Sequence, residues 1–476
     1  MKKFICLIIT LFISVSFFSQ NLKVSKNGRY FEKKGIPFLW IGDTGWELFH
    51  KLNREEATHY LETRAKQGFT VIQAVVLAEN DGLRKPNSYG EVPFINLDPE
   101  KPNEKYFEHV DFIVNKANEL GLVIGLLPTW GDKLYSMHPA AGPIVFNRKN
   151  AQIFGEYLGK RYEKKEIVWI LGGDRNVDSF EVLEIWRAMA AGLKKGDKGK
   201  HLMSFHPRGE SSSSYFLHNE DWLDFNIYQS GHARRYNPTY EWAMVDYLNH
   251  PVKPFVDGEP AYEYIPIRFW EYCDWTNPKR VPGYVLNDDN TIKDTAYFKD
   301  GFFNDYDVRI HAYWNFLAGA AGYTYGNNAV WQMFKKGGEI AIPCLSDWKD
   351  ALNHKGASQL INLNKLFKIY SIANLLTDQS VIYGINPKGE NHIRAAISTK
   401  NDWAFVYLSQ GQKVNVVMSK IHDENVSAFW FNPRDGKKIF IGEFKNNKIE
   451  EFIPPTNGIS NDWLLILESK KANFSI

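Results

Sequence analysis

Eight short runs of apolar residues recur along the first two thirds of the chain, and amphipathic stretches separate them. Their almost continuous apolar character is typical of parallel strands that are buried on both faces. Eight such strands with helices between them, over about 300 residues, predict a (β/α)₈ barrel. The runs lie at residues 37–42, 69–77, 121–127, 166–171, 201–205, 225–228, 254–256 and 322–325.

The amphipathic stretches begin with recognisable helix start signals. Asn53 with Glu56, and Asp178 with Glu181, have the spacing of a capping box, in which two side chains satisfy the first free backbone N–H groups of a helix. Asn150 precedes a third helical pattern. No glycine-rich phosphate-binding motif follows the first strand, which argues against a dinucleotide-binding fold.

Beyond about residue 370 the pattern changes to short strand-like segments, often with alternating apolar and polar positions. Turn signals at 432–436 and 454–458 separate some of them, and residues 346–377 have a helical pattern that joins the two parts. The sequence therefore predicts a barrel over residues 21–370 and a small antiparallel β-sandwich over 371–476. The predicted sandwich strands are 381–385, 393–397, 404–408, 414–418, 427–431, 438–441 and 463–467.

The first 20 residues have the pattern of a signal peptide. Lys2 and Lys3 precede an apolar run of about 15 residues, which is short for a membrane span and typical of a secretory signal. We therefore expect export to the periplasm, cell surface or exterior, with a retained membrane anchor as the alternative. After cleavage only Cys273 and Cys344 remain; they can pair in an oxidising compartment, but they form no disulfide framework.

Composition narrows the range of partners. A net charge of +2 from 57 basic and 55 acidic residues is too small to recruit nucleic acid or an anionic membrane. The 15 Trp and 24 Tyr supply flat rings that can stack on sugars, although they can equally fill a large core. No metal-binding spacing and no cofactor motif is present, so we expect neither a metal nor a cofactor. The sequence gives no indication of the oligomeric state.

Polar and aromatic residues follow nearly every predicted barrel strand. Because strand ends share one open face of a barrel, these side chains are expected to gather there. Asp43 and Asp132 suit sugar hydroxyls, His206 can orient a carboxylate, and the aromatic residues can form a stacking platform or simply pack beneath a loop. The candidate substrate-binding residues are Asp43, Trp46, Glu79, Trp130, Asp132, Asn176, His206, Gln229, Tyr262 and Trp331.

Two carboxylates stand out among these strand ends. Hydrolysis of a glycosidic bond needs one protonated and one ionised carboxyl group, and Asp174 and Glu259 follow the fourth and seventh strands directly after glycines. A helix N-cap is the alternative for Asp174, and an ion pair with Arg175 or Arg208 is the alternative for Glu259. Asp257 competes for the role of Glu259.

Long motifs in these segments resemble a known family. They include Leu-Trp-Ile-Gly-Asp-Thr-Gly-Trp at 39–46, Gly-Leu-Leu-Pro-Thr-Trp-Gly-Asp at 125–132, Trp-Ile-Leu-Gly-Gly-Asp-Arg-Asn at 169–176 and Pro-Phe-Val-Asp-Gly-Glu-Pro at 254–260. Nearly the whole chain after the signal resembles the apiosidase-like family, glycoside hydrolase family 140, whose barrel was called domain of unknown function 4038. The C-terminal part resembles a module named for collagen binding in a collagenase.

The resemblance implies an exported glycoside hydrolase that acts on pectic polysaccharide of the plant cell wall, with the apiose-bearing side chains of rhamnogalacturonan II as the family's target. It also implies that Asp174 is the acid/base and Glu259 the nucleophile of a retaining mechanism. Two alternatives stay open at this point: a non-catalytic glycan- or matrix-binding protein, and an endoglucanase-like hydrolase with another polysaccharide substrate.

Overall fold

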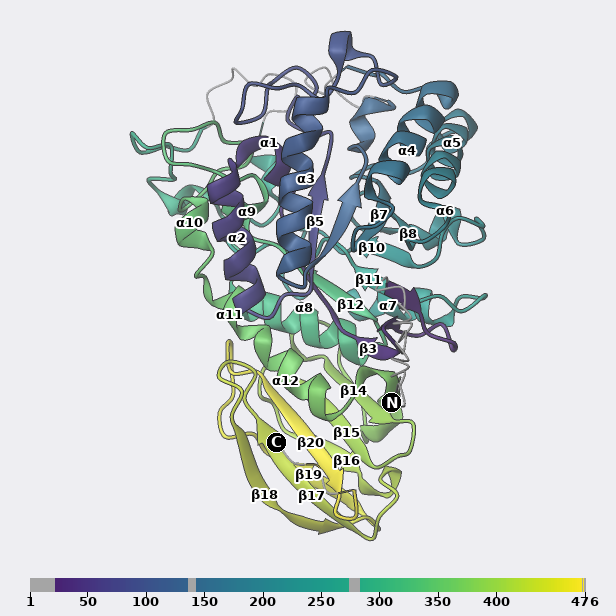
Figure 1. Ribbon diagram of the computed structural model, residues 1–476. Helices are drawn as coiled ribbons and strands as arrows, with labels where there is room; N and C mark the ends of the chain where they lie inside the picture. The colour runs from purple at the N-terminus through teal and green to yellow at the C-terminus, as the bar shows by residue number, and fades with distance from the viewer. Residues whose placement is uncertain (1–21, 136–142, 274–282, 473, 475–476) are drawn as a thin grey trace, which may run out of the picture.

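All eight predicted barrel strands are present in the computed structural model, which describes residues 22–135, 143–273, 283–472 and 474 (Figure 1). The predicted signal peptide lies outside the described residues. The barrel strands are β4 (Trp40–Thr44), β5 (Val71–Val75), β6 (Val123–Leu127), β7 (Ile167–Gly172), β8 (Met203–His206), β10 (Asn226–Gln229), β11 (Phe255–Asp257) and β12 (Gly322–Tyr325).

The barrel strands form a nearly closed barrel. Hydrogen-bonded neighbours follow the order β8-β7-β6-β5-β4-β12-β11-β10, all parallel, and β9 (Ser211–Ser212) adds an antiparallel edge to β10. No ladder joins β8 to β10 among the described strands. Instead, the Asp224 amide donates to the Met203 carbonyl at 2.8 Å, and the Ser204 hydroxyl donates to the Phe225 carbonyl at 2.7 Å. These two bonds bridge the seam where the barrel closes.

Helices cover the outside of the sheet and start close to where the sequence places them. The predicted capping box of Asn53 and Glu56 is confirmed at the start of α2, but α5 is capped by Ser179 rather than by Asp178. Asn147, not Asn150, caps α4. The helices are α1 (Leu48–Lys51), α2 (Arg54–Lys66), α3 (Glu104–Glu119), α4 (Arg148–Tyr162), α5 (Phe180–Asp197), α6 (Ser214–Leu217), α7 (Thr239–Leu248), α8 (Asp305–Leu317) and α9 (Asn328–Trp331).

A small N-terminal sheet was not predicted. Strands β1 (Leu22–Val24), β2 (Phe31–Lys33) and β3 (Ile36–Phe38) form a three-stranded antiparallel sheet, so the predicted strand 37–42 is divided between β3 and β4. The ring of Phe31 packs against Trp40 at 5.7 Å and Phe225 at 5.1 Å, near the starts of β4 and β10. The sheet therefore covers the end of the barrel opposite the strand C-termini.

The C-terminal part is an antiparallel β-domain, as predicted. A six-stranded sheet has the order β13-β14-β15-β20-β17-β18, and a two-stranded sheet, β16-β19, packs against it around one apolar core. We call this part the sandwich. Its strands are β13 (Leu375–Thr377), β14 (Ile393–Ser398), β15 (Trp403–Leu408), β16 (Val414–Val417), β17 (Asn425–Phe431), β18 (Lys438–Lys445), β19 (Ile449–Phe452) and β20 (Trp463–Ser469).

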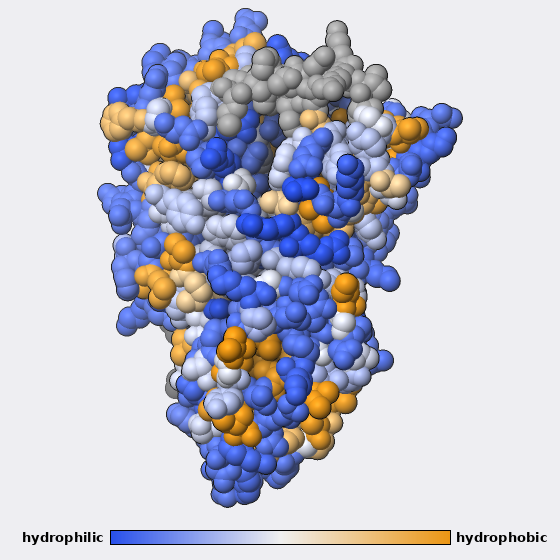
Figure 2. All heavy atoms as spheres, turned by 180° about the vertical axis from the view of Figure 1, so that it is seen from behind, coloured by the Kyte–Doolittle hydropathy of each residue, from blue (hydrophilic) through white to orange (hydrophobic). Residues whose placement is uncertain are grey.

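The predicted strand 381–385 is wrong, and the strands β13 and β19 were missed. A 3₁₀ turn occupies Gln379–Val381, and only Ile382 makes a bridge, to Val416. Tyr383 and Ile385 are exposed, so the segment lacks the alternating buried side chains that would hold a strand against the sheet. Figure 2 shows further apolar side chains gathered on the surface of the sandwich. The segment before the sandwich forms α10 (Trp348–Ala351), α11 (Lys355–Gln359) and α12 (Ile361–Ile369).

The barrel and the sandwich meet along α8. The buried guanidinium of Arg309 donates from Nε and Nη2 to both carboxylate oxygens of Asp462 at 3.0 and 2.8 Å. The rings of Tyr313 and Tyr407 stack at 4.7 Å between their centroids. One apolar cluster contains residues of both parts, so they share a core rather than only touching at their surfaces.

Three further features bear on function. In the described parts of the chain no helix is both long and apolar enough to cross a bilayer, and no group of three or more His, Cys, Asp or Glu side chains is placed to hold a metal ion. Cys273 and Cys344 are free thiols.

Candidate active site

Glu259 follows β11 at the open end of the barrel and lies between two imidazoles. Nε2 of His206, from the end of β8, is 3.2 Å from its Oε2, and Nε2 of His232, after β10, is 3.2 Å from its Oε1. Only 10% of the Glu259 side chain is exposed. The carboxylate is therefore held from both sides, with one edge open toward the mouth of the barrel.

Backbone contacts set the tautomer of both imidazoles. The amide of Asp174 donates to Nδ1 of His206, and the amide of Tyr262 donates to Nδ1 of His232, each at 3.4 Å. A neutral ring whose Nδ1 accepts a bond carries its hydrogen on Nε2, so both rings present an N–H group to Glu259. Burial opposes ionisation of Glu259, but the two imidazoles outweigh it and lower the pKa of Glu259 to about 2.

Asp174 reaches the same mouth through an unusual turn. Gly172, Gly173 and Asp174 have φ values of +87°, +108° and +51°, so three successive residues are left-handed. A Cβ on Gly172 would lie 2.3 Å from the His206 carbonyl oxygen, which requires glycine there. The left-handed conformation costs Asp174 about 1–2 kcal/mol, and strain of this kind is typical of functional sites.

The surroundings of Asp174 favour its protonated form. Partial burial raises its pKa, the negative charge of Glu259 raises it further, and Arg175 opposes both. Arg175 Nη1 lies 3.6 Å from Asp174 Oδ2, and 39% of the Asp174 side chain is exposed. Asp174 contacts one ring nitrogen of His206 through its amide while Glu259 faces the other, so the two candidate catalytic residues lie on either side of one imidazole.

A second group of charges lies beside Asp174. Glu79, after β5, has its pKa raised to about 8, chiefly by burial; Arg175 lowers it, and Asp174 and Asp132 raise it. Asp132, after β6, accepts bonds from Lys133 Nζ to both of its oxygens at 2.7 Å. Glu79 and Asp132 therefore both lie at the mouth, where the sequence places them. The carboxylate of Asp132 is already neutralised by the buried Lys133.

The predicted aromatic residues form the wall of the site. Trp46 and Trp130 pack at 5.2 Å, and both lie within 6 Å of the His206 ring, at 5.5 and 5.8 Å. Trp46 Nε1 donates to the hydroxyl of Tyr262 at 2.8 Å, and Trp331 belongs to the same apolar cluster. These rings are almost fully buried, so they support the site from behind more than they form an open platform.

The two predicted amide residues differ in their partners. Asn176 accepts a bond from the Arg208 amide at 3.2 Å and thereby ties two loops together. Gln229, at the end of β10, has a buried Oε1 with no hydrogen-bond partner among the described residues. A buried acceptor without a partner favours a hydrogen bond from a ligand or a water molecule.

Asp43 is not brought to the mouth. It points outward from β4, fully buried, where Arg64 Nε donates to it at 2.7 Å and the Tyr60 hydroxyl at 2.6 Å. Asp257 also points away from the mouth and accepts a bond from the Ser230 hydroxyl at 2.7 Å. Side chains alternate across a strand, so one position decides which side of the barrel wall a carboxylate faces.

Two residues of the site were missed by the sequence analysis. His232 contacts Glu259 as closely as His206 does, and Lys133 neutralises Asp132. The signal for His232 was available, because it follows the sixth strand closely, much as His206 ends the fifth. Arg175 pairs with Asp174, and no ion pair links it to Glu259 in the described structure.

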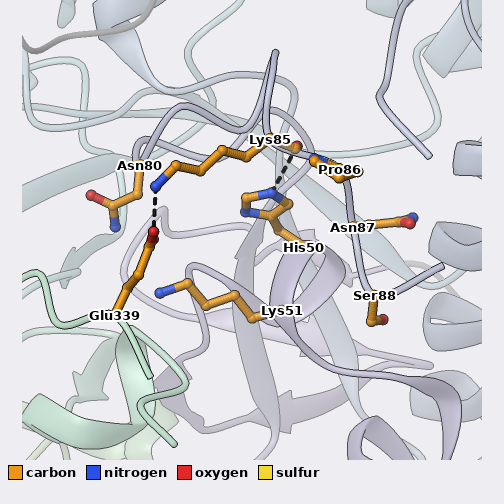
Figure 3. Close-up of a pocket in the computed structure, with 8 residues that line it drawn as sticks. All are labelled: His50, Lys51, Asn80, Lys85, Pro86, Asn87, Ser88 and Glu339. Carbon is orange, nitrogen blue, oxygen red and sulfur yellow. Dashed lines mark hydrogen bonds and ion pairs between the residues drawn. The ribbon is translucent and has the colours of Figure 1, made fainter. Parts of the chain in front are cut away.

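A separate hollow of about 230 Å³ lies beside the site, and no candidate catalytic residue lines it (Figure 3). Lys51 and Lys85 extend toward Glu339, and Lys85 forms an ion pair with it at 2.7 Å. Behind the hollow, Glu47 bonds His50 at 2.8 Å and accepts a bond from Asn80 at 3.2 Å. The lining residues are His50, Lys51, Asn80, Lys85, Pro86, Asn87, Ser88 and Glu339.

Solved structures with the same architecture define the class of this protein. One described as a glycoside hydrolase is 33% identical, with a TM-score of 0.82, and the match covers 94% of this chain and 97% of that one. A glycoside hydrolase family 5 protein from Bacteroides vulgatus is 30% identical with the same TM-score, over 96% and 95% of the two chains. The barrel is thus that of a glycoside hydrolase.

The family is defined more closely by sequence models. Residues 25–374 match the family described as "Apiosidase-like, catalytic domain", and the chain belongs to that family. Residues 376–468 match the "Putative collagen-binding domain of a collagenase". No curated protein matches the chain.

Proposed function

We propose that this glycoside hydrolase is a retaining, apiosidase-like enzyme that acts on pectic polysaccharide, with Glu259 as nucleophile and Asp174 as acid/base. The observation that carries the proposal is the single imidazole of His206 between the two residues, with its Nε2 facing Glu259 and its Nδ1 facing the backbone of Asp174. The two carboxyl groups have pKa values shifted in opposite directions, which is the division of roles that this chemistry needs.

In the first step Glu259 attacks the anomeric carbon while Asp174 gives its proton to the leaving oxygen. The bond from the anomeric carbon to that oxygen breaks, and a glycosyl ester of Glu259 forms. The N–H groups of His206 and His232 keep Glu259 ionised before the attack. They stabilise its carboxylate again when the ester is hydrolysed. In the second step Asp174, now ionised, takes a proton from the water that attacks the ester.

Two parts of the proposal concern where the enzyme works. We propose that residues 1–20 direct export, because the substrate is a polymer outside the cell and the segment has a signal-peptide pattern. The sandwich belongs to a family named for collagen binding, and we propose that here it contacts carbohydrate or matrix only as an accessory to the barrel.

The decisive experiment is incubation of the purified mature enzyme with rhamnogalacturonan II oligosaccharides and identification of the released sugar. The proposal expects one side-chain sugar, released first as the anomer present in the substrate, as observed by proton NMR. The Glu259→Gln variant serves as the control and should release nothing. Release of the opposite anomer contradicts the retaining mechanism.

Screening the same enzyme on β-glucans separates the other possibilities. Internal cleavage of glucan without any action on pectic material would replace the pectic assignment with an endoglucanase-like one. Binding to glycan or collagen with no product from a broad panel would indicate a non-catalytic protein.

A further inference from the structure

The loop that carries His232 has an outer side that contacts the sandwich. This loop, residues 230–238, joins β10 to α7. Nε2 of Gln410, from the loop that follows β15, donates to the hydroxyl of Tyr236 at 3.1 Å. Tyr236 is itself left-handed, with φ of +54°, so the bond holds a residue whose backbone is strained.

The residue before Tyr236, Arg235, is also held by contacts outside the loop. Arg235 Nε lies 3.3 Å from Asp307 Oδ1 on α8, and its Nη2 donates to the Phe302 carbonyl at 2.7 Å. On α8 the hydroxyl of Tyr306 donates to the carbonyl of Ser409, one residue before Gln410, at 2.9 Å. The same short sandwich segment therefore supports both the loop and the helix behind it.

Helix α7 continues this contact beyond the loop. The ring of Tyr240 stacks on His392 of the sandwich with centroids 3.7 Å apart. On the inner side, the Gly231 amide donates to the Glu259 carbonyl at 3.0 Å, and Asn237 Nδ2 donates to the Ser230 carbonyl at 2.7 Å. The loop thus spans the distance between sandwich and nucleophile, and it is bonded at both ends.

We infer that the sandwich is a working part of the active site: through the Gln410–Tyr236 bond it positions His232 against Glu259. Tyr236 and Gln410 are positioning residues that never reach the substrate. The His232–Glu259 contact is 3.2 Å, at the long limit for a hydrogen bond, so a shift of a few tenths of an ångström is enough to weaken it. The inference rests on the proposed roles of Glu259 and His232.

The charged and titratable groups around this contact define what a pH profile would report. Glu259 is faced by His206 from β8, His232 from the loop, Asp174 from β7 and Tyr262 from the turn after β11.

His232 in turn is near His311 of α8, and His311 is also near Arg235 of the loop. The Gln410–Tyr236 bond involves none of these groups, so a change that follows its loss reflects a displaced His232.

The test uses full-length Gln410→Ala, Tyr236→Phe and the double variant. Histidine labelled with ¹³C at Cε1 is observed by NMR, and the His232 signal is assigned by its loss in His232→Gln. We expect the signal to shift and titrate differently in each single variant, with no further change in the double variant, because both remove the same bond.

On the pectic substrate, kcat should fall about 3- to 30-fold with KM within a factor of two, and the acidic limb of the pH profile should move to higher pH.

Asn362→Ala is the matched control. Asn362 Nδ2 on α12 donates to the Pro433 carbonyl of the sandwich at 2.9 Å, so this variant removes one amide contact with the sandwich far along the chain from the His232 loop. It should leave the His232 signal, kcat and the pH profile unchanged.

The inference is overturned if Gln410→Ala behaves like Asn362→Ala in the His232 signal, in kcat and in the pH profile. If the His232 signal responds as expected but no pectic sugar is ever released, the positioning role stands and the proposed substrate fails.

Discussion

The carboxylates on the two sides of the barrel wall differ in their partners and in their access to the mouth. Asp174 and Glu259 lie at the mouth, where no lysine or arginine neutralises Glu259 in the described structure and Arg175 stands 3.6 Å from Asp174. Asp43 and Asp257 lie on the outer side, fully buried and bonded to Arg64 and Ser230. An acid at a strand end is therefore not enough to indicate catalysis; the side of the wall decides.

The largest effect should come from Glu259→Gln. This change keeps the shape of the side chain but removes the oxygen proposed to act as nucleophile, so kcat should fall by about 10⁴-fold or more. Single-turnover assays on the natural substrate measure the loss, and circular dichroism checks the fold. Turnover within tenfold of the wild type would remove Glu259 from the mechanism.

Asp174→Asn should have a smaller and substrate-dependent effect. Loss of the proposed acid should lower kcat about 10²- to 10⁴-fold on the proposed polysaccharide substrate. A nitrophenyl glycoside of the released sugar leaves without a proton, so its first step should be affected much less. Equal losses on both substrates would contradict the acid role and leave Asp174 as a binding residue.

His232→Gln should change the pH profile as well as the rate. Loss of an N–H bond to a charged carboxylate predicts a fall in kcat/KM of about 10- to 100-fold. Glu259 must be ionised, and its pKa of about 2 is low because of the imidazoles, so activity is lost as pH falls through that value. Without His232 that pKa rises, and the acidic limb should move to higher pH; an unmoved limb would assign the low pKa to another cause.

Asp43→Asn should have the smallest effect on turnover and a large effect on stability. The change leaves the buried guanidinium of Arg64 without its charge partner, which predicts a loss of about 3–5 kcal/mol in the free energy of unfolding. At low temperature the folded variant should keep kcat within a few-fold. Asp81→Asn, which removes an exposed pair with Arg84, is the control and should cost less than about 1 kcal/mol. Loss of activity without loss of stability would place Asp43 in the site after all.

Most of the fold could be predicted because its signals are local. Barrel strands buried on both faces produce apolar runs of the right length, and all eight fall within the predicted segments or overlap them. The capping box at Asn53 was correct because both of its side chains lie within four residues. Asp178 failed because a second capping residue, Ser179, follows it directly, and the sequence alone does not rank the two.

The rest of the fold depends on contacts that are distant in the sequence. Strands β1 to β3 are short and partly polar, and they form because Phe31 finds Trp40 and Phe225 at the base of the barrel. The site shows the same limit. Its residues could be collected from the strand ends, but whether Asp43 faces inward depends on the register of β4 against its neighbours. The position of His232 after the sixth strand places it near the mouth, but its contact with Glu259 depends on how the loop that carries it folds.

The buried pair of Arg309 and Asp462 has a consequence for how such enzymes can be recombined. Sequence models divide the chain near residue 375, yet that border runs between a guanidinium and the carboxylate that neutralises it. A barrel expressed without residues 376–476 would lose this carboxylate and leave Asp305, 2.7 Å from Arg309 Nη1, as the remaining acidic partner of Arg309. A foreign sandwich would need an acid at the place of Asp462 to restore the buried pair. Exchange of C-terminal modules among relatives should therefore succeed only between chains that inherit both halves of this pair.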